Sequence, residues 1–169
     1  YLRFYAREAR RFYAPNRRRD YPGEMNEYFY QPRGVVAVIG PFCFPMALIA
    51  GMTAAALVTG NTVIAKPARA ASVCGAKLIE ALIEAGLQPG VLNFVPGDGG
   101  QVGDYLVKHA GVDMVAFTGS SDVGRRIIES ARHWDAGRMI GFAGETPAPP
   151  LSKPAPPFFK HVIAEMSGK

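Results

Sequence analysis

The sequence predicts an α/β protein with a Rossmann-like, doubly wound parallel sheet and helices on both of its faces. Short apolar segments typical of buried strands alternate with stretches of helical length between residues 34 and 132. Residues 34–65 carry no charged side chain, which is typical of a buried strand-turn-helix-turn-strand unit. The chain is 49% hydrophobic and 20% charged, so a wholly disordered or collagen-like protein is excluded.

The first 33 residues are expected to form a helix and hairpin region in front of the sheet. Apolar residues from Leu2 to Tyr13 recur every three or four positions with arginines between them, and Pro15 ends this amphipathic helix. Extended structure is expected around Pro32-Arg33-Gly34, and a β-hairpin there is one interpretation.

Five strands and four helices are expected in residues 34–169, which we assign to one partial dinucleotide-binding domain. The strands are Val35–Ile39, Thr62–Ala65, Val91–Val95, Val112–Phe117 and His161–Ala164. The helices are Met46–Thr59, one capped by Ser72 and ended by Gly86, Gln101–His109 and Asp122–Arg132. A proline-rich insertion at 144–158 separates the last helix from the last strand, and a surface loop is favoured there over a peptide-docking segment.

Charge and hydropathy exclude some classes of partner. Most of the net charge of +5 lies in residues 1–33, which include Arg17-Arg18-Arg19. No nucleic-acid-binding motif accompanies this run, so a solvated surface is favoured over a site for nucleic acid or anionic lipid. Prolines and Gly60-Asn61 interrupt the uncharged stretch, and no membrane span is expected. Cys43 and Cys74 have no metal-binding spacing, so we expect no metal site and a reduced, cytoplasmic protein.

A phosphate-binding turn is the first candidate site. Gly119 and Ser120 follow an expected strand, and Gly124 lies in the helix that opens after them. Gly119 would let the backbone turn sharply, while the Ser120 hydroxyl and the free N–H groups of the helix start would attract a phosphate. The spacing is not G-x-G-x-x-G, and a plain strand-to-helix turn uses the same residues.

Three single residues are further candidates. Lys66 ends an expected strand at the rim where open α/β sheets bind ligands, although a solvated loop lysine fits equally well. Cys43 precedes an expected helix, a place that favours a nucleophilic thiol, but its two phenylalanine neighbours favour an inert buried one. Glu165 follows an apolar strand and is a candidate general base, although solitary carboxylates are usually solvated.

The order of five short motifs resembles the aldehyde dehydrogenase superfamily. The motifs are PFCFP at 41–45, GNTVIAKPA at 60–68, PGVLNFVPG at 89–97, FTGS at 117–120 and EMSGK at 165–169. NEYFYQP at 26–32, GDYLV at 103–107 and VIAEM at 162–166 are most similar to the glutamate-semialdehyde (pyrroline-5-carboxylate) dehydrogenases, including the dehydrogenase half of proline utilization A enzymes. The resemblance covers nearly the whole chain except about residues 134–158.

This resemblance implies a fold, a reaction and a set of site residues. In this family a cysteine thiolate attacks a small-molecule aldehyde, hydride passes to NAD or NADP, and water activated by a glutamate hydrolyses the thioester. Glu165 matches that glutamate. The cofactor residues implied are Lys66 at the ribose, Gly99 and Gly103 by the adenine, and Gly119, Ser120 and Gly124 at the pyrophosphate. Assembly into a homo-oligomer is left open.

Several departures from the family pattern lead to two hypotheses. The family's catalytic cysteine lies beyond the EMSGK motif, and Cys43 replaces the asparagine that would stabilise the oxyanion. Arg69, a further cofactor-binding candidate, stands where many NAD-preferring members carry an acid for the ribose hydroxyls, so either a preference for a 2′-phosphate or simply weak binding is expected. Ser167 replaces a glycine. The first hypothesis is a fragment of an incomplete aldehyde dehydrogenase fold that acts on glutamate semialdehyde in proline catabolism and is inactive alone. The second is a non-catalytic nucleotide-binding or interaction module, so whether the chain itself is an enzyme stays open.

Overall fold

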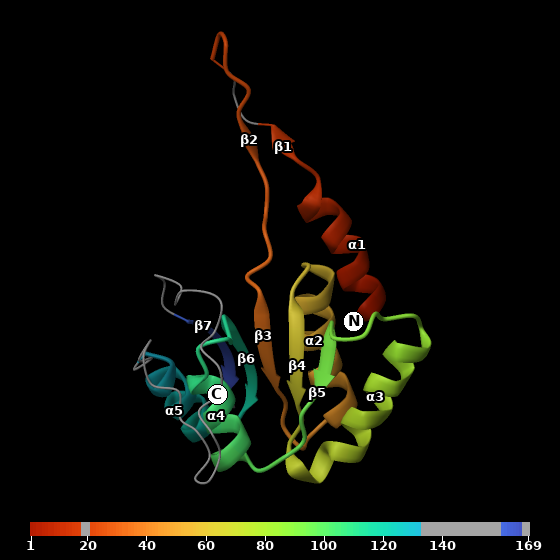
Figure 1. Cartoon of the computed structure of the whole chain (residues 1–169), viewed down its shortest axis with the longest axis vertical. Helices are drawn as coiled ribbons and strands as arrows, with labels where there is room; N and C mark the ends of the chain where they lie inside the picture. The colour runs from red at the N-terminus through yellow and green to blue at the C-terminus, as the bar shows by residue number, and fades with distance from the viewer. Residues whose placement is uncertain (18–20, 133–159, 167–169) are drawn as a thin grey trace.

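A five-stranded parallel sheet forms the centre of the molecule. The computed structural model describes residues 1–17, 21–132 and 160–166. The strands are β3 (Val35–Ile39), β4 (Thr62–Lys66), β5 (Leu92–Phe94), β6 (Met114–Gly119) and β7 (His161–Met166), in the order β5-β4-β3-β6-β7 (Figure 1). Neighbours in this order are parallel throughout, so the predicted fold class is confirmed.

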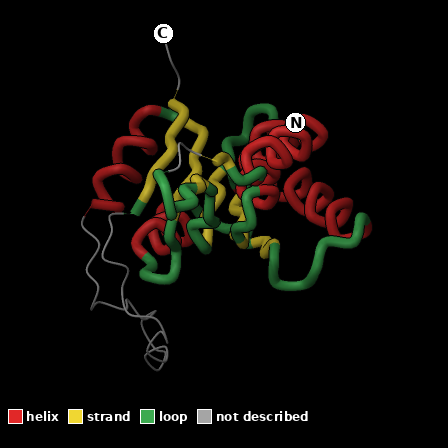
Figure 2. Tube along the Cα trace, turned by 90° about the horizontal axis from the view of Figure 1, so that it is seen from above, coloured by secondary structure: helices red, strands yellow, loops and turns green. Residues whose placement is uncertain are grey.

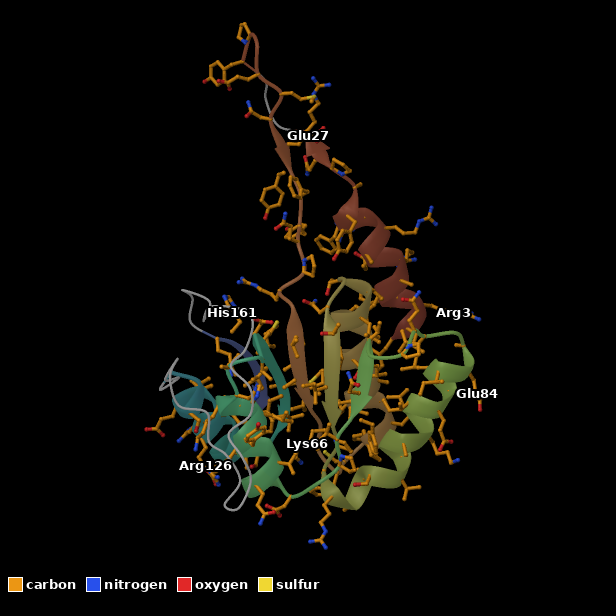
Figure 3. The ribbon with its side chains drawn as sticks, in the orientation of Figure 1. Arg3, Glu27, Lys66, Glu84, Arg126 and His161 are labelled. Atoms are coloured by element: carbon orange, nitrogen blue, oxygen red, sulfur yellow. The ribbon has the colours of Figure 1, made fainter. Side chains whose placement is uncertain are left out.

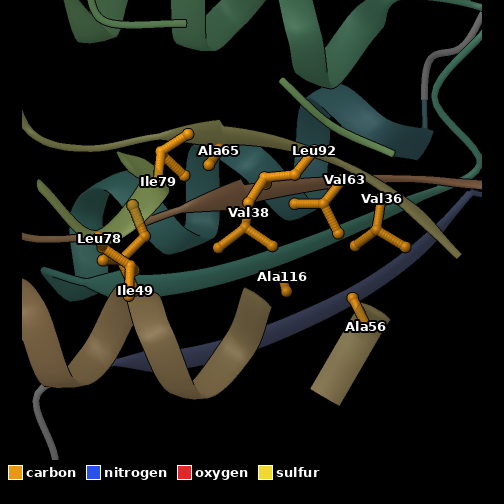
Figure 4. Packing of buried hydrophobic residues seen from close by; sticks show 10 residues of the cluster. All are labelled: Val36, Val38, Ile49, Ala56, Val63, Ala65, Leu78, Ile79, Leu92 and Ala116. Carbon is orange, nitrogen blue, oxygen red and sulfur yellow. The ribbon is translucent and has the colours of Figure 1, made fainter. Parts of the chain in front are cut away.

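Helices cover both faces of the sheet (Figure 2). Apolar side chains of α2 (Pro45–Val58) and α3 (Ser72–Glu84) pack with one face of the sheet, around Ile49, Val38 and Val63 (Figure 4). The helix α2 contains no charged residue because it is covered on nearly every side. Side chains of α4 (Asp104–Lys108) and α5 (Ser121–Arg132) pack with Val115, Phe117 and neighbours on the other face.

The N-terminal residues extend away from the sheet. The helix α1 (Leu2–Tyr13) has no buried residue, and β1 (Asn16–Arg17) pairs antiparallel with β2 (Glu27–Tyr28). Figure 1 shows this arm projecting past the end of the domain at which β3 begins. Pro22-Gly23 turns the chain at its tip, where the φ angle of Gly23 is 87° and the Glu24 N–H donates to the Tyr21 carbonyl at 2.9 Å.

The predicted hairpin about Pro32-Arg33-Gly34 is wrong in its location. β3 already has β4 and β6 as its two neighbours, so it offers no free edge to residues 28–30. The Asn61 side chain instead accepts hydrogen bonds from the N–H groups of Arg33 and Gly34, at 2.7 and 3.0 Å. The bend before β3 is therefore held by Asn61, in the turn between α2 and β4, and not by a strand pair.

Two of the predicted helices differ in detail. Ser72 is not the N-cap of α3, because the 3₁₀ turn η1 (Arg69–Ala71) leads into the helix and the Ser72 hydroxyl donates to the Arg69 carbonyl at 2.9 Å. Gly86 does follow the helix with a φ angle of 96°, as expected. Residues 101–109 are not one helix: a π-helical turn, η2 (Gly99–Gly103), precedes α4.

The proline-rich insertion at 144–158 lies outside the described residues, as do Arg18, Arg19 and Ser167. In the parts of the chain that are described, no helix has both the length and the hydropathy needed to span a membrane.

Candidate functional site

The carboxyl ends of three neighbouring strands meet at one edge of the sheet. Ile39 of β3 is in register with both Lys66 of β4 and Phe117 of β6. After β3 the chain adds β4 and β5 on one side and then returns to add β6 on the other. The strand order therefore reverses between β3 and β6, and the crevice beyond such a reversal is where open α/β sheets bind ligands.

Lys66 lies at this edge and is almost fully buried. Its exposed fraction is 3%, and its Nζ donates to the Pro67 carbonyl at 3.2 Å. Figure 3 shows it at the carboxyl end of β4, far from His161 at the start of β7. Burial lowers the pKa of Lys66, and the negative charge of Asp98 opposes that shift. The interpretation of Lys66 as a solvated loop lysine is therefore wrong.

A glycine-rich turn lies against the Lys66 side chain. A Cβ added to Gly103 would be 3.6 Å from Cε of Lys66, while a Cβ on Gly99 would meet nothing within 4 Å. The Asp98 carboxylate accepts a hydrogen bond from the Gly100 N–H at 2.7 Å and so caps the turn. Sequence analysis overlooked Asp98, although an aspartate two residues before the N–H that it caps is a recognisable signal.

The predicted phosphate turn joins β6 to α5. Ser120 is exposed, its carbonyl accepts from the Gly124 N–H at 3.0 Å, and its Oγ lies 3.5 Å from the Val123 nitrogen. The first turn of α5 thus presents backbone N–H groups to the edge that carries Lys66. Asp122 places a negative charge in this turn, which stabilises the helix but competes with a bound phosphate.

The two glycines of this turn serve packing as well. The φ angle is not positive at Gly119 or Gly124. A Cβ on Gly119 would lie 2.5 Å from Cζ of Phe117, and one on Gly124 would lie 2.5 Å from Sδ of Met166. Gly119 is thus required by the ring beside it and not, as predicted, by a sharp backbone turn.

Glu165 comes to the same edge from the last strand. It is in register with Thr118, and its side chain is exposed. The Thr118 hydroxyl lies 3.5 Å from Sδ of Met52 in α2. Glu165 is therefore brought beside the phosphate turn by strand pairing, although more than forty residues separate the two in the sequence.

Cys43 lies in the loop that leaves β3 at this edge, and its thiol is free and exposed. Its neighbours Phe42 and Phe44 are 71% and 77% exposed, so the interpretation of an inert buried thiol is wrong. Phe44 has a φ angle of 43°, a left-handed conformation that is strained for a bulky residue. Arg69 is also exposed, in η1 just after Lys66.

No three His, Cys, Asp or Glu side chains gather into a metal-binding group in the described ranges.

The edge combines one buried lysine, two glycine-bearing turns, a helix start and an exposed carboxylate. A buried cation beside open glycine backbone and a helix N-terminus is suited to a ligand that carries both a ribose and phosphates.

Comparison with known proteins gives a consistent result. The model of the aldehyde dehydrogenase family matches residues 1–145. The chain is 44% identical over 169 residues to 1-pyrroline-5-carboxylate dehydrogenase of Bacillus subtilis (strain 168), covering 100% of this chain and 29% of that protein. The corresponding enzyme of Anoxybacillus flavithermus (strain DSM 21510 / WK1) is 49% identical over 148 residues, which are 88% of this chain and 25% of that protein.

Solved structures similar to this chain carry the same names as these relatives or are proline utilization A proteins. A 1-pyrroline-5-carboxylate dehydrogenase from Thermus with bound NAD matches with a TM-score of 0.83 and 42% identity, over 98% of this chain and 29% of that one. Proline utilization A from Bdellovibrio bacteriovorus matches with a TM-score of 0.84 and 40% identity, over 98% of this chain and 15% of that one. The chain thus spans less than a third of the length of these relatives. On the strength of the family match and of this shared fold, the chain belongs to the aldehyde dehydrogenase family.

Proposed function

We propose that this chain supplies the dinucleotide-binding part of an NAD(P)-dependent aldehyde dehydrogenase that oxidises glutamate semialdehyde in proline catabolism. The observation that carries the proposal is the buried Lys66 at the carboxyl end of β4, beside the strand β3 where the order reverses, with Gly103 against its side chain. The relatives named 1-pyrroline-5-carboxylate dehydrogenase and proline utilization A support the substrate class.

The residues at the edge fit a dinucleotide. Lys66 would hold the adenosine ribose, with Gly103 packed against its side chain, and the open backbone at Gly99 leaves room for the adenine. Ser120 and the N–H groups at the start of α5 would hold the pyrophosphate, with Gly119 and Gly124 allowing the turn to pack closely. When bound, NAD or NADP supplies the hydride acceptor.

Arg69 bears on the choice between the two cofactors. Its side chain is exposed and follows Lys66 by three positions at the end of β4. A guanidinium there can pair with a 2′-phosphate but offers no acceptor to a ribose hydroxyl. We therefore expect NADP to bind more tightly than NAD.

Glu165 would act as the general base that activates water, because it is exposed at the edge beside Thr118. Cys43 occupies the place of an oxyanion-stabilising asparagine, and a thiol is a weaker hydrogen-bond donor than an amide. Loss of one such donor typically costs about 10²–10³ in rate. We expect the chain by itself to bind nucleotide and to oxidise no aldehyde.

The second candidate is a non-catalytic interaction module that associates with copies of itself. Large apolar side chains are exposed along the arm formed by α1, β1 and β2, namely Tyr1, Leu2, Phe4, Phe12, Tyr13, Tyr21, Met25, Tyr28, Phe29 and Tyr30. Exposed apolar patches of this extent mark interaction surfaces.

Both Cys43 and Cys74 are free thiols, in keeping with a reducing cytoplasmic location.

Calorimetric titration with NAD⁺ and NADP⁺ tests the nucleotide-binding role. We expect binding by the wild type and a loss of at least about tenfold in affinity for Lys66→Met, because the cation at the ribose is removed. Lys77→Met is the matched control, since Lys77 is exposed on α3 and pairs only with Glu80 among the interactions seen. Arg69→Ala is expected to weaken NADP⁺ binding more than NAD⁺ binding. Absence of binding heat with either nucleotide would refute the proposal.

Light scattering at several protein concentrations tests self-association. Phe29→Asp and Tyr21→Asp are expected to shift the chain toward monomer, because a charge in an apolar interface is costly. Ile83→Asp is the control, since Ile83 is equally exposed but lies on α3. A wild type that is monomeric at all concentrations would contradict the second candidate.

A further inference from the structure

The last strand is paired with β6 along its whole length and packs against α5. Among the described strands, β7 lies at the edge of the sheet and pairs with β6 only. Its side chains alternate: Val162, Ala164 and Met166 pack against the core, whereas Ile163 and Glu165 face outward. A slip of one residue in register would turn every side chain to the opposite face and would bury Glu165.

Two side chains fix this strand at its two ends. At the carboxyl end, Met166 packs directly against Gly124 of α5. Just before the amino end, Nζ of Lys160 donates hydrogen bonds to the carbonyls of Val107 and His109, at 2.6 and 2.8 Å. Val107 lies in the last turn of α4 and His109 is its C-cap, and the His109 carbonyl also accepts a hydrogen bond from the Val112 N–H at 3.1 Å. Lys160 thus ties the start of β7 to a helix that packs on the same sheet.

We propose that Lys160 is a positioning residue that fixes the register of β7 and thereby holds Glu165 beside Thr118. Only the chemical role of Glu165 rests on the proposed function. The placement of the strand itself stands on its pairing with β6, on the two hydrogen bonds of Lys160 and on the alternation of buried and exposed residues along β7.

The charged groups around Lys160 predict how its contact with the Val107 and His109 carbonyls responds to pH. Asp113 precedes β6, Lys108 and His109 come from the end of α4, and His161 is exposed in β7. Burial lowers the pKa of Lys160 to about 8, against the opposing charge of Asp113. The Tyr105 ring lies beside the His109 ring, and Nδ1 of His109 accepts a hydrogen bond from the Gly111 N–H.

The sign of the pH effect follows from this shift. When Lys160 leaves the two carbonyls, its pKa returns to the ordinary value of 10.5. Between about pH 8 and pH 10.5, formation of this contact therefore releases a proton. Attachment of β7 therefore strengthens as the pH rises through this window. A neutral amine still has two N–H groups, which suffice for the two carbonyls.

Hydrogen exchange at the amides of β7 and β3 tests the proposal in the full chain. We expect Lys160→Met to speed exchange in β7 by about tenfold or more while β3 changes less than about twofold, because two hydrogen bonds to α4 are lost. Lys108→Met is the matched control, since this neighbouring lysine of α4 is exposed. It should change exchange in neither strand.

The pH profile is a second measurement, and its wild-type arm does not depend on whether the variant folds. In the wild type, protection of β7 relative to β3 should rise roughly tenfold between pH 7 and pH 9 after correction for the intrinsic exchange rate. In Lys160→Met this rise should disappear. Equal acceleration in β3 and β7, or a flat wild-type profile, would overturn the proposal. Failure of the proposed function would appear as absent nucleotide binding, which these measurements do not involve.

Discussion

Gly124 of α5 and Met166 of β7 approach each other so closely that the helix position leaves no room for a side chain. A Cβ on Gly124 would lie 2.5 Å from Sδ and 2.6 Å from Cγ of Met166, and 3.2 Å from Cε1 of Phe117. The glycine that the sequence places in a phosphate turn therefore also sets how closely the last strand approaches the helix.

Gly124→Ala is expected to lower the free energy of unfolding by about 1 kcal/mol. Overpacking costs about 1–3 kcal/mol, which outweighs the gain of up to about 1 kcal/mol from replacing glycine in a helix. Urea denaturation measures the change. In a Met166→Ala background the clash is relieved, so the same substitution should become neutral or stabilising. Equal effects in both backgrounds would contradict the contact.

Asn61→Ala is expected to destabilise the protein by about 2–4 kcal/mol. The side chain is buried, accepts from the N–H groups of Arg33 and Gly34, and donates to the Ala56 carbonyl at 3.1 Å. Its removal leaves several part-buried polar groups without partners. Asn93→Ala is the control, because its amide makes only an exposed bond to the Gly90 carbonyl among those seen. Urea denaturation measures the free energy of unfolding of both variants. A decrease for Asn61→Ala no larger than that for Asn93→Ala would contradict the prediction.

Thr53→Val is expected to raise the free energy of unfolding by about 1 kcal/mol. Thr53 is fully buried, and within the described ranges its hydroxyl has no hydrogen-bond partner. Valine keeps the shape and removes the unpaired polar group. Thr59→Val should be neutral or destabilising instead, since Oγ1 of Thr59 bonds the Ala55 carbonyl at 2.8 Å. Thermal unfolding measures the stability of both variants. A Thr53→Val protein that is less stable than Thr59→Val would contradict the prediction.

Stability is expected to fall as the pH drops below about 6.5, in part through His109. Burial first and the charge of Lys160 second lower the pKa of His109 below its ordinary value of 6.5. The unfolded chain then binds more protons in this range, so acid favours unfolding. His109→Gln should flatten the dependence of unfolding free energy on pH between about 5 and 7.5. Equal slopes in wild type and His109→Gln would count against this assignment.

Local patterns in the sequence predicted most of the fold. The strands from Val35 and Thr62 begin where expected, because buried apolar runs and the turn at Gly60 are local signals. Lys66 was placed at the correct edge for the same reason, since the end of a parallel strand defines that edge.

Features that depend on distant residues were predicted less well. The hairpin was misplaced because nothing near Pro32 reveals that β3 has neighbours on both sides. The exposure of Cys43 and the packing of Gly119 on Phe117 depend on loop geometry. The pairing of Thr118 with Glu165 is a question of register between distant segments. The roles assigned to Lys66, Arg69, Ser120 and Glu165 remain predictions.

The pairing of β6 with β7 also has a consequence for the connection between them. The two strands are neighbours in the sheet but are joined through α5 and residues 133–159. The entropy of closing such a loop grows with the logarithm of its length, so that doubling it costs only about 0.6 kcal/mol. Because pairing with β6 and the contacts of Lys160 and Met166 position β7, we expect a change in the number of residues between α5 and β7 to cost little stability.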